Sequence, residues 1–280
     1  MNFKYILKIT CEDKKGIVAS ITSFITKIDG FIIESAQFGD EKSNRFFMRI
    51  VFSSDTDLIE NDFFKTNFAS IEKNLAIEYE IFPQAYRPKM LILVSKEGHC
   101  LHHLLYKIES GMLNANATII ASNHNSLEKI ATWYNIPFVY LADKNKREGQ
   151  ILELIDRHKI DLTVLARYMQ ILSPQVSKKL YGKIINIHHS FLPSFKGAKP
   201  YEQAYDRGVK LIGATAHYVN EELDEGPIIT QEVVAVNHSH NPQDLKQLGQ
   251  DIESRVLFSA IQAHNEHRVF LNGKKTIVFK

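Results

Sequence analysis

The stretch Ile185 to Pro193, INIHHSFLP, places an amide and two imidazoles at the end of an apolar run. In an extended strand, alternate side chains point to the same face, so Asn186 and His188 project together while His189 tends to the other side. The amide of Asn186 can donate hydrogen bonds, and the imidazole of His188 can transfer protons. Side by side, they can act together on one small polar group. Ordinary loop chemistry at a strand end produces the same pattern, so further residues are needed.

A carboxylate that can join this pair lies in the acidic turn NEELDEGP, between the predicted strands LIGATAHYV and IITQEVVAV. Turn residues reach back over neighbouring strand ends, which makes Asp224 a candidate third member. The trio would supply an oxyanion donor, a proton-handling group and a charge that orients it. Thr215 and His217 share a face of the preceding strand and, with His189, are candidate supporting residues that order the trio or a water molecule.

Other chemistries have less support. His264 and His267 have ligand-compatible spacing but no partner carboxylate cluster, so no metal site is expected. Cys11 and Cys100 are the only cysteines, too few for a disulfide framework or a zinc site. A net charge of +2 over 280 residues gives no basic field for nucleic acid. No apolar run reaches membrane-spanning length and the start lacks a signal-peptide pattern, so we expect a cytoplasmic enzyme acting on a small molecule.

The elements that must position these residues fall into two parts. Residues 1–83 predict the order β-α-β-β-α-β of the ferredoxin-like plan, and residues 84–88, in the segment PQAYRP, form the expected linker. Residues 89–280 alternate strands with helices, which predicts a doubly wound, mostly parallel α/β sheet. The strand KIINI ends at the opening stretch, where open α/β sheets bind ligands. Helices of this second part are expected near residues 99–108, 127–134, 148–158, 174–180 and 242–267.

Three motifs carry a family resemblance. INIHHSFLPSF, TAHYV and LDEGPII occur in this order and resemble the folate-dependent formyltransferase family, from Pro88 to about His267. The resemblance implies a catalytic trio of Asn186, His188 and Asp224. LARYMQILSP resembles the segment with which that family lines its pterin pocket. The folate-binding positions implied in this way are Met169, Leu172, Val219 and Glu222.

The acceptor of the formyl group is not the same throughout the family. Glycinamide ribonucleotide formyltransferases have a Gly- and Ser-rich phosphate loop where this chain reads VSKEGHCLHHLL, a poor phosphate cradle. Methionyl-tRNA formyltransferases have a further RNA-binding domain, for which the short segment after His267 leaves no room. The first 83 residues, with CEDKKGIVASI, resemble an ACT domain. Including that domain, almost the whole chain is similar to the formyltetrahydrofolate deformylase family.

This second resemblance implies hydrolysis of 10-formyltetrahydrofolate to tetrahydrofolate and formate, supplying purine synthesis and balancing one-carbon pools. The folate is the substrate, and neither a cofactor nor a metal is implied. In the reaction, His188 either polarises the formyl oxygen or protonates the leaving nitrogen, while Asp224 either orients the imidazole or takes the proton of the water. Two alternatives remain open: a formyltransferase to an amine, and a non-catalytic protein that senses an amino acid and a folate.

ACT domains commonly bind small amino acids between subunits, at the turn between the first strand and the first helix. By this resemblance, Asp13, Gly16 and Ile17 are the expected effector-binding residues, and the protein is expected to be a homo-oligomer. Gly16 would allow close approach to the main chain, and the helix start offers free N–H groups to a carboxylate. A tight turn that simply needs glycine explains Gly16 equally well.

Overall fold

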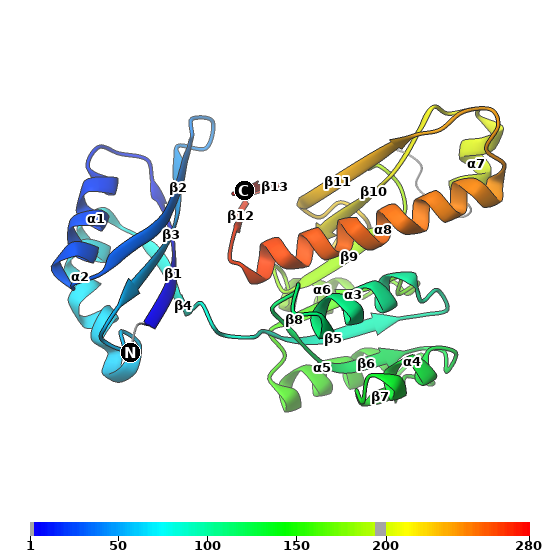
Figure 1. Ribbon diagram of the computed structural model, residues 1–280, viewed down its shortest axis with the longest axis horizontal. Helices are drawn as coiled ribbons and strands as arrows, with labels where there is room; N and C mark the ends of the chain where they lie inside the picture. Colours follow the sequence, from blue (N-terminus) through cyan, green and yellow to red (C-terminus); the bar gives the residue numbers. More distant parts are fainter. Residues whose placement is uncertain (1–2, 194–199) are drawn as a thin grey trace. The chain divides into compact units, whose positions relative to one another are not determined.

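The computed structural model describes residues 3–193 and 200–280, which divide into two compact units. Unit 1 comprises Met1–Tyr86, Glu266–Asn272 and Ile277–Lys280, and unit 2 comprises Arg87–Asn265 and Gly273–Thr276. Residues 194–199, SFKGAK, of which the first two end the first family motif, lie outside the described residues. Figure 1 shows the elements of both units.

Unit 1 has the predicted order of strands and helices. Its main elements are β1 (Phe3–Glu12), α1 (Ile17–Lys27), β2 (Phe31–Asp40), β3 (Arg45–Ser54), the 3₁₀ helix η1 (Glu60–Asp62), α2 (Phe63–Leu75) and β4 (Glu78–Pro83). The strands form an antiparallel sheet in the order β2-β3-β1-β4. Helices α1 and α2 cover one face of this sheet (Figure 1), where Phe24 and Phe68 pack with Met48 and Ile50 of β3. Burial of such side chains stabilises the unit by about 1.5 to 3 kcal/mol each.

Strand β3 is buried on both faces, because nine of its ten residues are buried. The C-terminal hairpin β12 (Val269–Asn272) and β13 (Lys275–Val278) was not expected from the sequence. Phe270 of β12 meets the ring of Phe47 edge-on, with centroids 5.7 Å apart, and Asn272 Nδ2 donates to Asp40 Oδ2 at 2.7 Å. Residues 266–272 and 277–280 therefore group with unit 1, whereas the sequence interpretation placed all of residues 89–280 in the second domain.

Unit 2 contains a seven-stranded sheet in the order β11-β10-β9-β8-β5-β6-β7. Strands β5 to β9 are parallel, as the alternation of strands and helices predicted, whereas β10 runs antiparallel to β9 and β11. The strands are β5 (Lys89–Val94), β6 (Asn116–Ser122), β7 (Phe138–Tyr140), β8 (Leu162–Leu165), β9 (Ile184–His188), β10 (Leu211–Tyr218) and β11 (Ile228–Ala235). All four residues of β8 are buried, as expected for a strand with both faces covered.

The helices of unit 2 largely match those expected from the sequence. They are α3 (His99–Glu109), α4 (Glu128–Trp133), α5 (Arg147–His158), α6 (Pro174–Lys179), α7 (Pro200–Asp206) and α8 (Pro242–Asn265). Helix α7 was not expected, and α8 ends two residues earlier than predicted. Helix α6 begins after Ser173, whose side chain accepts a hydrogen bond from Val176 N, with Pro174 at its first position. This cap ends the LARYMQILSP segment.

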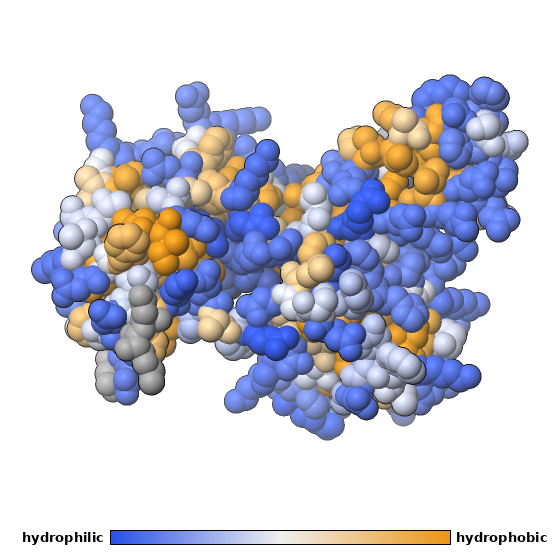
Figure 2. Space-filling view, viewed as in Figure 1, coloured by the Kyte–Doolittle hydropathy of each residue, from blue (hydrophilic) through white to orange (hydrophobic). Residues whose placement is uncertain are grey.

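Most of the surface visible in Figure 2 is hydrophilic, with apolar side chains gathered in a few patches. In the ranges 3–193 and 200–280, the structure contains no helix that is both long enough and apolar enough to cross a membrane.

Candidate active site

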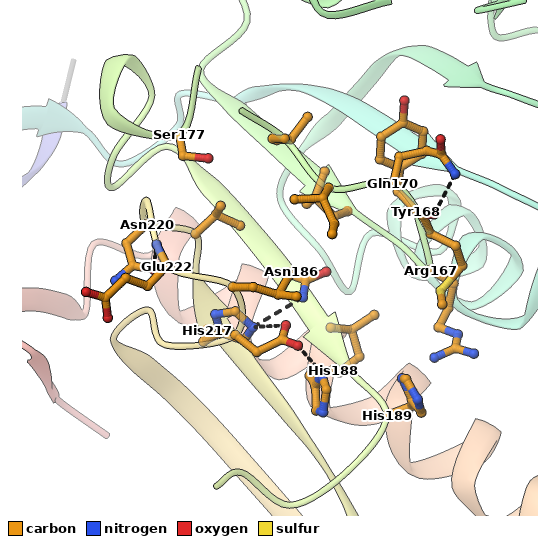
Figure 3. A pocket seen from close by; sticks show the side chains of 18 of the residues that line it. Arg167, Tyr168, Gln170, Ser177, Asn186, His188, His189, His217, Asn220 and Glu222 are labelled. Carbon is orange, nitrogen blue, oxygen red and sulfur yellow. Dashed lines mark hydrogen bonds and ion pairs between the residues drawn. The ribbon is translucent and has the colours of Figure 1, made fainter. Parts of the chain in front are cut away.

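The carboxyl end of β9 brings the predicted trio together. Strand β9 places Asn186 and His188 on one face, and the turn after β10 brings Asp224 over them. His188 Nδ1 lies 3.2 Å from Asp224 Oδ2. His217 Nε2 lies 3.7 Å from Asp224 Oδ1. Figure 3 shows the rings of His188 and His217 and the amide of Asn186. The sequence prediction of an amide, an imidazole and a carboxylate meeting at this strand end therefore has a structural counterpart.

The turn DEGP has a backbone that sets the position of Asp224. Asp224 adopts a left-handed conformation with φ of 57°, which is uncommon for a residue other than glycine. Two residues later, a Cβ on Gly226 would lie 1.6 Å from Tyr218 O, so only glycine allows the turn to pack against the end of β10. This close approach fixes the carboxylate beside the two histidines.

The environment of Asp224 keeps its carboxyl group ionised. Burial alone would raise the pKa of Asp224, but the imidazoles of His188 and His217, which face its two oxygens, bring that pKa well below its usual value. Within the described part of the chain, the other ring nitrogen of His188, Nε2, is buried and has no hydrogen-bond partner. Since Nδ1 faces the carboxylate, Nε2 is the atom of His188 that is available to a bound substrate.

His217 orients the amide of Asn186. His217 Nδ1 lies 2.8 Å from Tyr218 O, so this nitrogen carries a hydrogen, because a carbonyl oxygen only accepts. Nε2 of a neutral His217 then accepts from Asn186 Nδ2 at 3.2 Å. The longer distance to Asp224 would become a hydrogen bond only if His217 were protonated. In the neutral form, one N–H of Asn186 is held by His217 and the second remains for a ligand.

The other two supporting candidates differ in their surroundings. The Thr215 hydroxyl donates to Ser190 O at 2.9 Å and accepts from Leu192 N at 3.1 Å, so it holds the loop after β9. This hydroxyl is buried and does not line the pocket described below. The ring of His189 lies 5.0 Å from that of His188. Burial, followed by the charges of Arg167 and His188, lowers the pKa of His189 to about 4, so this ring is neutral near pH 7.

A pocket of about 260 Å³ opens beside the trio and is lined by Asn186, His188, His217 and Asp224. The four positions that the resemblance assigns to folate binding, Met169, Leu172, Val219 and Glu222, all line the same pocket (Figure 3 shows it from close by). Leu172 is buried, Val219 is partly buried, and Met169 and Glu222 are exposed. The pocket therefore combines an apolar wall with polar groups at one end, as small-molecule sites commonly do.

The remaining candidates from the sequence lie elsewhere. Asp13 and Gly16 are exposed, and Gly16 has a φ of 90° at the start of α1, whereas the Ile17 side chain is part of the core. His264 Nδ1 lies 2.8 Å from the Tyr218 hydroxyl, and the ring of His267 stacks on Phe82.

A buried polar cluster beside the pocket was not expected from the sequence. Glu253 of α8 is 1% exposed. Its Oε2 lies 2.7 Å from His99 Nε2 and 3.4 Å from Arg167 Nε, and its Oε1 accepts from Tyr201 at 2.6 Å. The sequence signal that could have revealed this cluster is Glu253 itself, an acidic residue on the face of α8 that otherwise packs in the core. Glu253 forms, with His99 and Cys100, the one group of three possible metal ligands in the described residues, but its carboxylate already faces a guanidinium.

Residues 88–261 match the family model described as formyl transferase. A formyltetrahydrofolate deformylase from Corynebacterium sp. (strain P-1) is 44% identical over 283 residues, which covers 99% of this chain and 98% of the relative. The crystal structure of a formyltetrahydrofolate deformylase from Burkholderia mallei has a TM-score of 0.93 and 42% identity, covering 99% of this chain and 100% of that chain.

A phosphoribosylglycinamide formyltransferase from Anaplasma phagocytophilum has a TM-score of 0.65 and 31% identity, covering 70% of this chain and 96% of that chain. The mostly parallel sheet, the polar trio at the end of β9 and the family match together define a protein of the formyl transferase class. The deformylases match nearly the full length of this chain, which the formyltransferase structure does not. The chain belongs to the formyltetrahydrofolate deformylase family.

Proposed function

We propose that this protein hydrolyses 10-formyltetrahydrofolate to tetrahydrofolate and formate. In this reaction a C–O bond forms between water and the formyl carbon, and the C–N bond to the folate breaks. One proton of the water reaches the leaving nitrogen, and formic acid loses another to give formate. The formate would supply purine synthesis and the reaction would balance one-carbon pools. The full-length similarity to deformylases supports this proposal.

The trio can divide the work as follows. Asn186 donates its free N–H to the formyl oxygen as this oxygen becomes an oxyanion, which is a transition-state interaction. Asp224 is ionised because its pKa is lowered, and it holds His188 through Nδ1. The same carboxylate accepts a proton from the attacking water. His188, when both of its ring nitrogens carry a proton, presents Nε2–H toward the substrate and can transfer this proton to the leaving nitrogen, and the proton that Asp224 takes from the water replaces it. None of these steps requires a cofactor, and we assign no metal to the site.

The single observation that carries the proposal is the His188–Asp224 pair, with the partnerless Nε2 beside a pocket lined by the amide of Asn186. We expect purified protein to release formate from 10-formyltetrahydrofolate in the absence of any amine. Formate and tetrahydrofolate should appear in equal amounts. Glycinamide ribonucleotide should neither speed the reaction nor become formylated, and a formylated nucleotide as the main product would assign the protein to the transferases instead.

We further propose that unit 1 is an ACT-type module that binds a small amino acid in a homo-oligomer. Its β-α-β-β-α-β order and the open turn at Gly16, where an added Cβ would meet no atom within 4 Å, support this proposal. Asp13 and the main chain at Gly16 and Ile17 would contact the effector. Calorimetric titration with glycine and methionine at millimolar concentration tests it. Absence of heat and of any change in rate would leave unit 1 with an assembly role only.

A further inference from the structure

Arg167 is a pocket residue with an unusual backbone and unusual surroundings. It follows β8, whose last residue, Leu165, pairs with Asn186 of β9, and it lines the same pocket as the trio. Its φ is 63°, in the left-handed region that a long side chain seldom occupies. Strained conformations of this kind cluster at binding sites, where the surrounding structure holds them. In Figure 3 the guanidinium extends toward His189, next to His188.

A buried carboxylate holds one side of this guanidinium. Arg167 Nε lies 3.4 Å from Glu253 Oε2, and the Arg167 side chain is only 14% exposed. Burial by itself would raise the pKa of Glu253, but His99, Arg167 and Tyr201 lower it, so Glu253 is ionised. Tyr201, which donates to the other oxygen of Glu253, is also tightly packed. A Cβ on Gly249 would lie 2.0 Å from the Tyr201 hydroxyl. Glu253 thus fixes the charge of Arg167 in place.

The guanidinium nevertheless has unused hydrogen-bonding capacity. Arg167 Nη1 is buried and has no hydrogen-bond partner in the described ranges of the chain, and Nε, although it lies 3.4 Å from Glu253 Oε2, makes no hydrogen bond. A buried donor without a partner costs about 1 to 3 kcal/mol, and more when it is charged. Guanidinium groups bind carboxylates through two parallel N–H donors. Arg167 is therefore prepared for an oxyanion that the protein itself does not supply.

The charges around the pocket indicate what kind of ligand Arg167 binds. Among the described residues, Arg167 is the only lysine or arginine that lines the pocket, whereas Glu221, Glu222 and Asp224 contribute three carboxylates. The neighbouring His189 is neutral near pH 7 and adds no positive charge. Hydrolysis converts a neutral formyl group into an anion beside ionised Asp224, and without a cation this anion would be repelled.

We propose that Arg167, held by Glu253, binds the formate ion produced in the pocket. The guanidinium receives the carboxylate of the product after the C–N bond has broken, while the folate is bound by other groups. This inference rests on the proposed hydrolysis, and it adds a product-binding residue to the trio.

The test measures inhibition by sodium formate, with sodium chloride at equal ionic strength as the reference, for the native protein and for Arg167→Gln. We expect formate to inhibit the native protein and its inhibition constant to rise at least about tenfold in Arg167→Gln, as expected for loss of a charged hydrogen bond. The KM for 10-formyltetrahydrofolate should change less than about threefold. Arg167→Lys keeps the charge but loses the two parallel N–H donors. Its inhibition constant for formate should therefore lie between those of the native protein and Arg167→Gln.

Arg255→Gln is the matched control, because Arg255 also lies in unit 2 and pairs with a carboxylate, Glu232, at 3.1 Å, but does not line the pocket. Its inhibition constant should equal that of the native protein. Near-UV circular dichroism checks that each variant is folded, and formate-induced changes in melting temperature give a second measure of affinity. If Arg167→Gln is unfolded, the comparison of Arg167→Lys with the native protein decides the question.

Two results would overturn the proposal for Arg167 alone: no effect of formate on the native protein beyond that of chloride, or an unchanged inhibition constant in a folded Arg167 variant. A rise in KM with unchanged formate affinity would instead assign Arg167 to the folate. Failure of the native protein to release formate from 10-formyltetrahydrofolate would be a different outcome, because it would remove the proposed hydrolysis itself.

Discussion

Asp224→Asn is expected to lower the kcat for formate release by about 10²-fold or more, because it removes the charge that orients His188 and draws the proton from the water. The amide nearly preserves the shape of the carboxylate, so binding of the folate should stay within about threefold of the native value. Single-turnover rates and equilibrium binding of tetrahydrofolate measure the two effects separately. Glu225→Gln, in the same turn but exposed, is the matched control and should retain a normal kcat.

A near-normal kcat with weakened folate binding in Asp224→Asn would make the carboxylate a binding group and would refute the assigned role. The lowered pKa of Asp224 also has a consequence for stability against pH. A carboxyl group whose pKa is lower in the folded state contributes stability above its unfolded pKa of about 3.9, and this contribution is lost as the pH falls through the folded value. Asp224→Asn should therefore lose less stability in acid than the native protein does.

Asn186→Ala is expected to lower kcat by about 10²- to 10³-fold, the usual effect of removing one oxyanion donor. The amide is held by His217 at 3.2 Å, so its free N–H is already oriented before the charge develops on the formyl oxygen. KM should change little, since the neutral carbonyl of the substrate gains less from this donor than the oxyanion does. Steady-state kinetics of the folded variant measure both parameters.

Asn220→Ala provides the comparison for this amide. Asn220 Nδ2 donates to Glu225 O and Asn220 Oδ1 accepts from Glu222 N, so both of its polar atoms are used within the turn. Its loss should lower kcat much less than the loss of Asn186. Equal effects of the two substitutions would indicate that Asn186 contributes to the local structure and does not act in the transition state.

The central part of the site could be predicted because it depends on short-range geometry. The two-residue period of a strand places Asn186 and His188 on one face, and the position of β9 in a parallel sheet places that face at the ligand edge. The glycine of the DEGP turn could be read from the sequence. The close approach of Gly226 to Tyr218 O, which requires a glycine there, could not. The resemblance implied a pterin pocket, and the four positions assigned to it line one pocket in the structure.

The parts that could not be predicted depend on contacts between distant residues. Arg167 and Glu253 are 86 positions apart in the numbering and become partners only when α8 packs on the sheet. The left-handed backbone of Arg167 has no signature in its residue type, since arginine rarely adopts it. Thr215 was a candidate to order the trio or a water molecule because it shares a strand face with His217, but its hydroxyl is used by Ser190 and Leu192.

The C-terminal return of the chain has a consequence for protein engineering. The chain passes from unit 1 to unit 2 after Tyr86 and returns to unit 1 at Glu266, and only the short segment Gly273–Thr276 then groups with unit 2, so unit 1 is discontinuous. A fragment that ends at Tyr86 would lack Phe270 against Phe47 and would lose the Asn272 partner of Asp40. Exchanging this unit between relatives therefore requires its N-terminal and C-terminal segments to be moved together.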